Sequence, residues 1–458
     1  MAICTSFLNL NHQSNVILSL KSNKNLPFSE VLSKKELRCH IQDTESRERI
    51  FTPEVTLWAF LSQVIDDDKS QQAAVSRVIA ASIAQRKKPP SANTSAYSQA
   101  RARLPEDILS ALTRDTAKQV SSNIPNSWLW KGRHIKLVDG STLSMPDTIK
   151  NQLEYPQPTS QKKGVGFPIT RIVVIVDYIT GVLLDFAMGQ YSGENTGEHA
   201  LLRELMTSFN TNDVMLGDAY YPSFFLMATL IMLGISGVFP AKTARCCDFR
   251  KGKRLGKKDH IATWKKPRRP TWMTTVEYDE FPKEILVREV AIESQRPGFR
   301  TKVRVLVTTF LDPKEVSKLD LSNIYACRWF VELTLRSIKT TMQMDVLRGK
   351  TPKMVRKEIW MHFLAYNLIR KLMAQAAWVH GKTVTALSFK LALQLTKAFQ
   401  QAGLLNKENP EQYDYLLEAI VYKKISNRPG RQEPRCVKRR PKTFPKLQKE
   451  RILYKNLA

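Results

Sequence analysis

Apolar and polar positions follow a helical period between residues 51 and 122. Three helices are predicted there, in FTPEVTLWAFLSQVI, in AAVSRVIAASIAQRKK and, after the loop PPSANTS, from Leu104 to Val120. Thr52 followed by Pro53 indicates where the first helix begins, because threonine caps helix N-termini and proline fits the first turn. The N-terminal part of the chain is therefore expected to be helical.

The pattern changes after residue 126 to short apolar runs separated by turn residues. Strands are predicted at His134–Asp139, Pro168–Tyr178, Val182–Gly189, in DVMLGD ending at Asp218, and at Gly237–Pro240. Helices are expected at Gly197–Phe209 and from Pro222. Three strands followed by helix, strand, helix and strand is the order of ribonuclease-H-like folds. We therefore predict an α/β fold with a ribonuclease-H-like catalytic core.

A second β-rich stretch interrupts this core. Strand-like segments occur at Glu284–Glu293 and Lys302–Phe310, and helical periodicity returns from Asn323 to Val379 with a break near Gly349–Pro352. The predicted domains are a polar segment of unassigned fold (1–48), a helical DNA-binding domain (49–125), the core in two parts (126–240 and 313–380), an inserted β-rich basic subdomain (241–312), and C-terminal helices with a basic tail (381–458).

The longest apolar run is Phe224–Phe239, and its 16 residues fall short of the roughly 20 that a membrane span needs. A buried helix leading into a buried strand is the better interpretation. The N-terminus also lacks the basic start and the unbroken apolar stretch of a signal peptide. We therefore expect a cytoplasmic protein with no membrane partner. The GKT at 349–351 lacks the upstream glycine of a phosphate-binding loop, so no nucleotide cofactor is expected.

The net charge of the chain indicates the class of its binding partner. The 458 residues include 71 Lys and Arg against 42 Asp and Glu, a formal net charge of +29. Residues 242–270 hold 12 basic and 2 acidic residues, and the tail from Val421 holds 13 and 2. Such a surplus favours a polyanion, with nucleic acid first and an anionic membrane surface second. Basic residues also recur through the N-terminal helices, which fits either a DNA-binding module or a merely solvated helical face.

Three carboxylates carry the candidate chemistry. Asp139 and Asp218 each end an apolar strand, and Glu332 lies in a later helix. Carboxylates at neighbouring strand ends converge, and such a trio can hold one or two Mg²⁺ ions for phosphoryl chemistry. The alternative for either aspartate alone is an ordinary turn-initiating role. A second cluster, Cys246 and Cys247 near Asp248, Asp259 and His260, fits no structural zinc spacing.

The helix that carries Glu332 has further polar residues on the same predicted face. Tyr325, Arg328, Glu332 and Lys339 are separated by 3, 4 and 7 residues, which places them together at helical periodicity. A carboxylate flanked by cations suits a DNA phosphate held against metal ions. The alternative is a surface helix with i,i+4 ion pairs, although the adjacent apolar residues indicate that its other faces are buried.

These residues complete the motif Y-x2-R-x3-E-x6-K. The chain thereby resembles the DDE transposases of bacterial insertion sequences, specifically the insertion-sequence-four type branch. The flanking VDGSTLSMPD, GDAYYPSFF and ACRWFVE look like the three acidic regions of that family, and the likeness spans roughly residues 50–450. Four fixed positions together with two aspartate motifs in the right order make the resemblance specific.

The resemblance implies a triad of Asp139, Asp218 and Glu332 that binds Mg²⁺, with Mn²⁺ as an alternative. It further implies cut-and-paste movement of a DNA element, in which a homodimer binds terminal inverted repeats, cleaves the element's ends and joins them to target DNA. The protein would then act in a bacterial cytoplasm, on the nucleoid when bound to DNA. By the same analogy, the DNA-binding residues Tyr325, Arg328 and Lys339 hold phosphates near the transposon end.

The chain departs from the family pattern at one position. Family members that flip a base use a Trp on a late strand of the insertion, and that strand here reads KVRVLVTT. Trp264 and Trp272 lie earlier and could stack on a base, although a core role is favoured for them. Two other functions stay open: a ribonuclease-H-like nuclease without strand transfer, and a non-catalytic repressor that binds transposon ends.

Overall fold

The computed structural model describes residues 50–242, 247–294, 302–402, 404 and 410–422. They form two compact units. Unit 1 takes its described residues from 50–123, 180–183 and 336–422, and unit 2 takes them from 124–179 and 184–335. The predicted polar segment 1–48 and nearly all of the basic tail lie outside the described residues.

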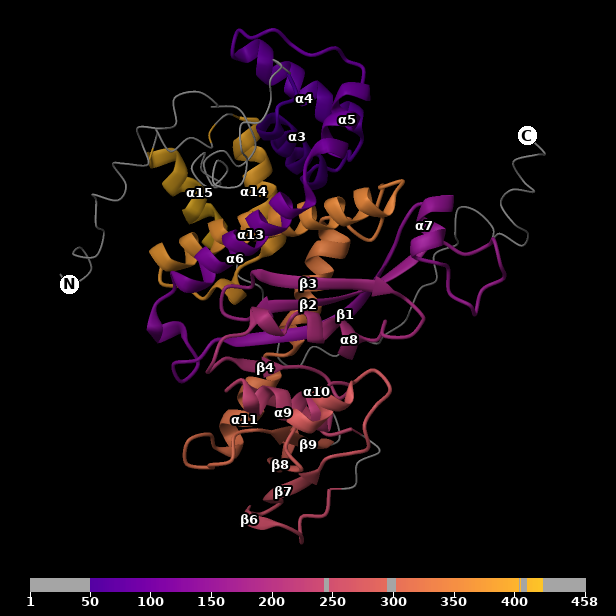
Figure 1. The fold of residues 1–458 in the computed structure, drawn as a ribbon. Helices are drawn as coiled ribbons and strands as arrows, with labels where there is room; N and C mark the ends of the chain where they lie inside the picture. The colour runs from indigo at the N-terminus through magenta and orange to yellow at the C-terminus, as the bar shows by residue number, and fades with distance from the viewer. Residues whose placement is uncertain (1–49, 243–246, 295–301, 403, 405–409, 423–458) are drawn as a thin grey trace, which may run out of the picture. The chain divides into compact units, whose positions relative to one another are not determined.

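Unit 1 is a bundle of helices around the 28-residue helix α13 (Figure 1). Helices α3, α6, α14 and α15 all pack against α13, which is buried along most of its length. Thr351 caps the start of α13 and Pro352 occupies its first turn. The helices are α3 (Pro53–Ile65), α4 (Gln71–Ala84), α5 (Ser95–Arg103), α6 (Glu106–Ser122), α13 (Pro352–Val379), α14 (Phe389–Gln401) and α15 (Pro410–Tyr422).

The three helices predicted between residues 51 and 122 are confirmed, as is the cap at Thr52, whose Oγ1 accepts a hydrogen bond from the N–H of Val55. A fourth helix, α5, was not predicted. Its sequence SAYSQARAR is mostly polar, and its buried residues are Tyr97, Ala100 and Arg101. So few buried positions give almost no periodic signal in the sequence.

Two of the basic residues in these helices are used within unit 1. Arg101 is 8% exposed, its guanidinium lies over the rings of Phe60 and Tyr97, and it donates a hydrogen bond to Gln63. Arg77 forms an ion pair with Asp66. These two cations therefore stabilise the bundle and add little to a DNA-binding face.

Unit 2 contains a nine-stranded mixed sheet in the order β3-β2-β1-β4-β5-β9-β8-β7-β6 (Figure 1). β1 is antiparallel to β2 and parallel to β4, and β4 is parallel to β5. The strands are β1 (Ile135–Ser144), β2 (Ile169–Asp177), β3 (Leu183–Gln190), β4 (Val214–Leu216), β5 (Ser236–Pro240), β6 (Lys253–Gly256), β7 (Asp259–Lys265), β8 (Glu284–Ser294) and β9 (Lys302–Thr308).

The five strands predicted before residue 241 are all present in the predicted order, and the chain is a mixed α/β protein. Two boundaries were wrong. The strand predicted to end at Asp218 ends at Leu216. The first strand does not end at Asp139 but continues to Ser144, because β2 pairs with it residue by residue as far as Ser144↔Ile169. Sequence pattern missed this extension because its residues, GSTLS, are mostly polar or small.

Helices α8 (Glu198–Glu204) and α9 (Phe224–Met232) cover one face of the sheet. Side chains from both helices form a single apolar core with Val138, Met215 and other strand residues. The apolar run 224–239 therefore is a buried helix leading into a buried strand, as predicted. Within the described residues, no helix is both long and apolar enough to cross a membrane.

Strands β6–β9 extend the same sheet beyond β5, because β9 pairs with β5. Asp259 on β7 forms a two-bond ion pair with the fully buried Arg288 on β8, at 2.8 and 2.6 Å. His260 lies 3.1 Å from Glu289. Asp259 and His260 of the suggested cluster thus have protein partners, and the described residues, which exclude Cys246, show no metal-binding group there.

The buried ion pair gives a stability prediction. Arg288→Met is expected to lower the free energy of unfolding by about 3–5 kcal/mol, because Asp259 would keep a buried and unpaired charge. Combining it with Asp259→Leu should restore most of the loss, as measured by denaturant unfolding. Arg250→Met is the matched control, because Arg250 is exposed and its pairing with Asp248 contributes little. Equal losses in the single and double variants would contradict the explanation.

Candidate active site

Strand register places two of the predicted acids side by side. The parallel ladder of β1 and β4 ends at the pair Leu137↔Leu216. Asp139 and Asp218 each lie two residues beyond that pair and therefore at the same height, Asp139 within β1 and Asp218 just after the end of β4. The backbone pairing of β1 and β4 therefore sets the height of both aspartates.

The Asp139 carboxyl lies in an unfavourable environment for negative charge. Burial raises its pKa to about 6, and the neighbouring carboxylates of Asp218 and Glu198 act in the same direction. The N–H of Gly140, 3.0 Å from Oδ1, and the guanidinium of Arg328 oppose that rise. Asp139 therefore has surplus negative charge around it when ionised, which is the environment that a bound cation would stabilise.

Asp218 begins the tight turn that follows β4. Its Oδ1 accepts a hydrogen bond of 2.8 Å from the N–H of Tyr220. The next residue, Tyr221, is fully buried, and its ring folds back against Gly217. The turn-initiating alternative considered for this aspartate is thus observed, and it fixes the direction of the carboxylate.

The segment that carries the Tyr-Arg-Glu-Lys motif is not one regular helix, which corrects the sequence prediction. Tyr325 lies near the end of α11 (Lys318–Ala326), Arg328 lies in the break that follows, and Glu332 lies in α12 (Trp329–Arg336). In that break, the N–H groups of Cys327 and Arg328 bond to carbonyls three residues back, which tightens the chain locally. Lys339 lies in a π-helical turn, Ser337–Thr341.

Arg328 connects two of the three acids electrostatically. Its guanidinium is 3.0 Å from the Glu332 carboxylate and is also attracted by Asp139. Tyr325 is 8% exposed, and the guanidinium of Arg304 lies over its ring at 5.4 Å. Lys339 belongs to unit 1, whereas the other motif residues belong to unit 2.

The three acids provide only carboxylate oxygens, the ligand type that Mg²⁺ and Mn²⁺ prefer. Asp139 and Asp218 are half-buried, and the Glu332 side chain is 35% exposed. Among the described residues, no three His, Cys, Asp or Glu side chains are gathered at metal-binding distance, and Glu332 is engaged by Arg328. The chemistry of the donor set fits a hard divalent cation.

Sequence reasoning missed two residues of this site, Glu198 and Tyr221. Glu198 Oε2 accepts a hydrogen bond of 3.1 Å from the Tyr221 hydroxyl. The Glu198 carboxyl also lies so close to Gly140 that a Cβ there would be 2.3 Å from its Cδ. The signal in the sequence was a glycine next to each strand-end aspartate, Gly140 and Gly217, which leaves room for another side chain.

The two tryptophans of the insertion differ in exposure. Trp264 is 5% exposed, belongs to the apolar core and donates a hydrogen bond of 3.0 Å to Glu289, so the favoured core role is confirmed. Trp272 is 38% exposed, with the guanidinium of Arg203 3.7 Å from its ring centroid. Trp264 is therefore unavailable for stacking on a base.

Comparisons with known proteins identify the family of this chain. The family model described as "Transposase DDE domain" matches residues 130–368, which include Asp139, Asp218 and Glu332. The chain belongs to this family of DDE transposases, the metal-dependent enzymes that cleave DNA and transfer its strands.

The chain is similar in sequence to the transposase InsG of insertion sequence element IS4 from Escherichia coli (strain K12). It is 25% identical over 411 residues, which cover 88% of this chain and 89% of that protein. Among solved structures, the piggyBac transposase in a synaptic complex with hairpin DNA matches with a TM-score of 0.42 and 11% identity, covering 91% of this chain and 87% of the other. The resemblance to DDE transposases of the insertion-sequence-four type is thus confirmed.

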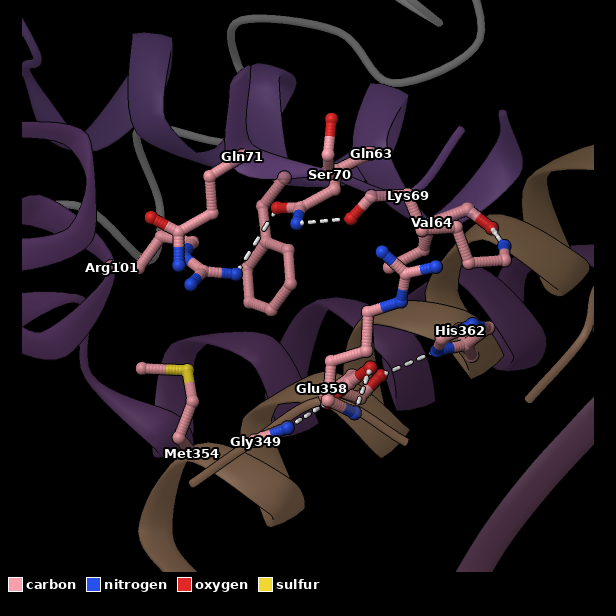
Figure 2. Close-up of a pocket in the computed structure, with 12 residues that line it drawn as sticks. Gln63, Val64, Lys69, Ser70, Gln71, Arg101, Gly349, Met354, Glu358 and His362 are labelled. Atoms are coloured by element: carbon pink, nitrogen blue, oxygen red, sulfur yellow. Dashed lines mark hydrogen bonds between the residues drawn. The ribbon is translucent and has the colours of Figure 1, made fainter. Parts of the chain in front are cut away.

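A cavity of about 150 Å³ lies within unit 1 and contains none of the predicted site residues (Figure 2). Its polar lining joins α3, α5 and α13: Gln63 accepts hydrogen bonds from Tyr97 and Arg101, and Glu358 accepts three from the N–H groups of Arg348 and Gly349. These bonds satisfy polar groups inside the bundle, so we interpret the cavity as structural.

His362 in this lining makes the stability of unit 1 sensitive to acid. Burial lowers its pKa to about 3, against 6.5 in the unfolded chain. Between these values the unfolded chain binds a proton that the folded chain does not, so the free energy of unfolding falls as pH decreases below 6.5. The free energy of unfolding of His362→Leu, taken relative to that of the wild type, should therefore rise by about 2 kcal/mol from pH 7 to pH 5. Urea unfolding at the two pH values measures this change. A constant difference between the two proteins would contradict this.

Proposed function

We propose that Asp139, Asp218 and Glu332 are the catalytic acids of this transposase, and that they bind Mg²⁺ or Mn²⁺ for cut-and-paste transposition of an insertion sequence. The observation that carries the proposal is the register of β1 and β4, which puts Asp139 and Asp218 at one height on adjacent strands. When bound, the ions would activate an attacking oxygen and stabilise a leaving oxygen at phosphorus.

The side chains around the acids support phosphate binding. Arg328 is attracted by both Asp139 and Glu332, so its positive charge lies where a DNA phosphate would meet the acids. A phosphate oxygen could take the place of Glu332 on this guanidinium, which would free the Glu332 carboxylate for a metal ion. By analogy with the family motif, we assign Tyr325 and Lys339 to phosphates near the transposon end, and the guanidinium of Arg304 lies over the Tyr325 ring.

The substrate in this proposal is double-stranded DNA, first the terminal inverted repeats of the element and then target DNA. We assign recognition of the repeats to the helical segment 49–125, with help from the inserted β-rich subdomain 241–312 and the basic tail, around a ribonuclease-H-like core. The working form would be a homodimer that pairs the two ends in a synaptic complex. The setting would be the cytoplasm of a bacterium, where nucleoid DNA is accessible.

Membership of the transposase family favours strand transfer over simple nuclease activity. A repressor that only binds transposon ends would not need its acids, yet all three are present on the sheet edge and on α12. The two alternatives differ in outcome: a nuclease would cleave without joining, and a repressor would bind without cleaving.

Cleavage of a duplex that carries the element's inverted repeat, in Mg²⁺, tests the assignment. Glu332→Ala should reduce cleavage and strand transfer by at least about 1,000-fold while end binding is retained, because one ligand of the ions is lost. Equal cleavage by the variant and the wild type would refute the triad. If the wild type binds but does not cleave, the repressor interpretation is supported instead.

Arg328→Ala should weaken binding of the repeat and lower strand transfer, because a phosphate contact is lost while the core packing is unchanged. The matched control is Arg336→Ala, which removes an exposed arginine from the last turn of α12. Gel-shift titration and strand-transfer assays measure both effects. If the two variants behave alike, the role assigned to Arg328 is wrong.

A further inference from the structure

Asp139 and Asp218 are connected by a second link in addition to the strand ladder. The ladder of β1 and β4 stops at Leu137↔Leu216, before either aspartate is reached. Beyond it, the Glu198 carboxyl packs on Gly140, the Tyr221 hydroxyl donates to Glu198, and the Tyr221 ring packs on Gly217. The two glycines are the immediate neighbours of the two aspartates.

Both glycines are needed for this arrangement. A Cβ at Gly140 would lie 2.3–2.7 Å from the carboxyl atoms of Glu198, and a Cβ at Gly217 would lie 2.7 Å from Tyr221 Cδ2. Because strand residues alternate between faces, Gly140 faces the α8–α9 layer together with Val138, while Asp139 points the other way. The missing side chain at 140 lets the Glu198 carboxylate come up to the backbone beside Asp139.

The start of α8 is fixed to the turn after Asp218 at two consecutive residues. Besides the Glu198–Tyr221 bond, the His199 ring lies 3.0 Å from the carbonyl oxygen of Tyr220, through Nε2. On the other side, Arg171 of β2 donates to the carbonyl of Thr196, 3.0 Å away. A half-buried glutamate held this firmly has a defined position, and Asp139 is within reach of its charge.

We propose that Glu198 supports the metal site through its negative charge from the opposite face of β1, and that Tyr221 is the positioning residue that holds its carboxylate against Gly140. This inference rests on the proposed function, since it takes Asp139 and Asp218 as metal ligands. Glu198 contributes negative charge, which strengthens the binding of a divalent cation. Tyr221 contributes the hydrogen bond that keeps the carboxylate against Gly140.

The test is binding of Mn²⁺ to the full-length protein without DNA, measured from the electron paramagnetic resonance signal of free Mn²⁺. Glu198→Gln removes the charge but keeps the shape and an oxygen that can accept the Tyr221 hydrogen bond. We expect its dissociation constant for Mn²⁺ to rise at least about ten-fold, the size typical of residues that support a metal site. Glu204→Gln, at the exposed end of the same helix, is the matched control and should bind as the wild type does.

Tyr221→Phe tests the positioning role without a change of charge and should also weaken Mn²⁺ binding, by less than Glu198→Gln. Thermal melting without metal should be the same for Glu198→Gln and wild type, which separates a metal role from a structural one. Asp139→Asn serves as the reference. If it loses Mn²⁺ while Glu198→Gln binds within two-fold of wild type, the inference is wrong and the proposed function stands. If Asp139→Asn also binds normally, both are wrong.

Discussion

Two carboxylates fixed at the same height on adjacent parallel strands repel each other, and this repulsion governs the rest of the site. The ladder from Ile135↔Val214 to Leu137↔Leu216 sets where Asp139 and Asp218 emerge, so the backbone does not allow them to separate. Burial of Asp139 adds a desolvation cost to its charge. The guanidinium of Arg328 offsets part of this cost, and a bound divalent cation would offset more.

The chain combines a net charge of +29 with a group of acidic residues at the candidate site. DNA needs cations along its path, while the chemistry needs anions at one point to hold metal ions. In the described part of the basic stretch 242–270, the residues of β6 are exposed or half-buried, whereas Asp259 in that stretch is paired with Arg288. The charge of Asp259 is thus compensated inside unit 2 and does not oppose the basic residues of this stretch.

Sequence patterns predicted what depends on neighbours in the chain: the strands with their order, three N-terminal helices and the cap at Thr52. They failed where tertiary contacts decide. The polar end of β1 stays in the sheet because β2 pairs with it, and α5 forms although few of its residues are buried. The equal spacing of Tyr325, Arg328 and Glu332 suggested one helix, yet the chain tightens and breaks at Arg328. Periodicity cannot distinguish a straight helix from two short ones that share an i,i+4 pair.

Glu198 could not be found from spacing, because it is about 60 residues from Asp139 and about 20 from Asp218 and belongs to no motif with either. What identifies it is the space left by Gly140 and Gly217. Beyond the last pair of the β1/β4 ladder, β1 continues along β2, whereas the chain after β4 turns at Asp218. The link through Glu198 and Tyr221 joins the two ends just beyond the last pair. In the role proposed for Glu198, its negative charge would strengthen cation binding, and the link would connect the geometry of the strand ends to metal binding.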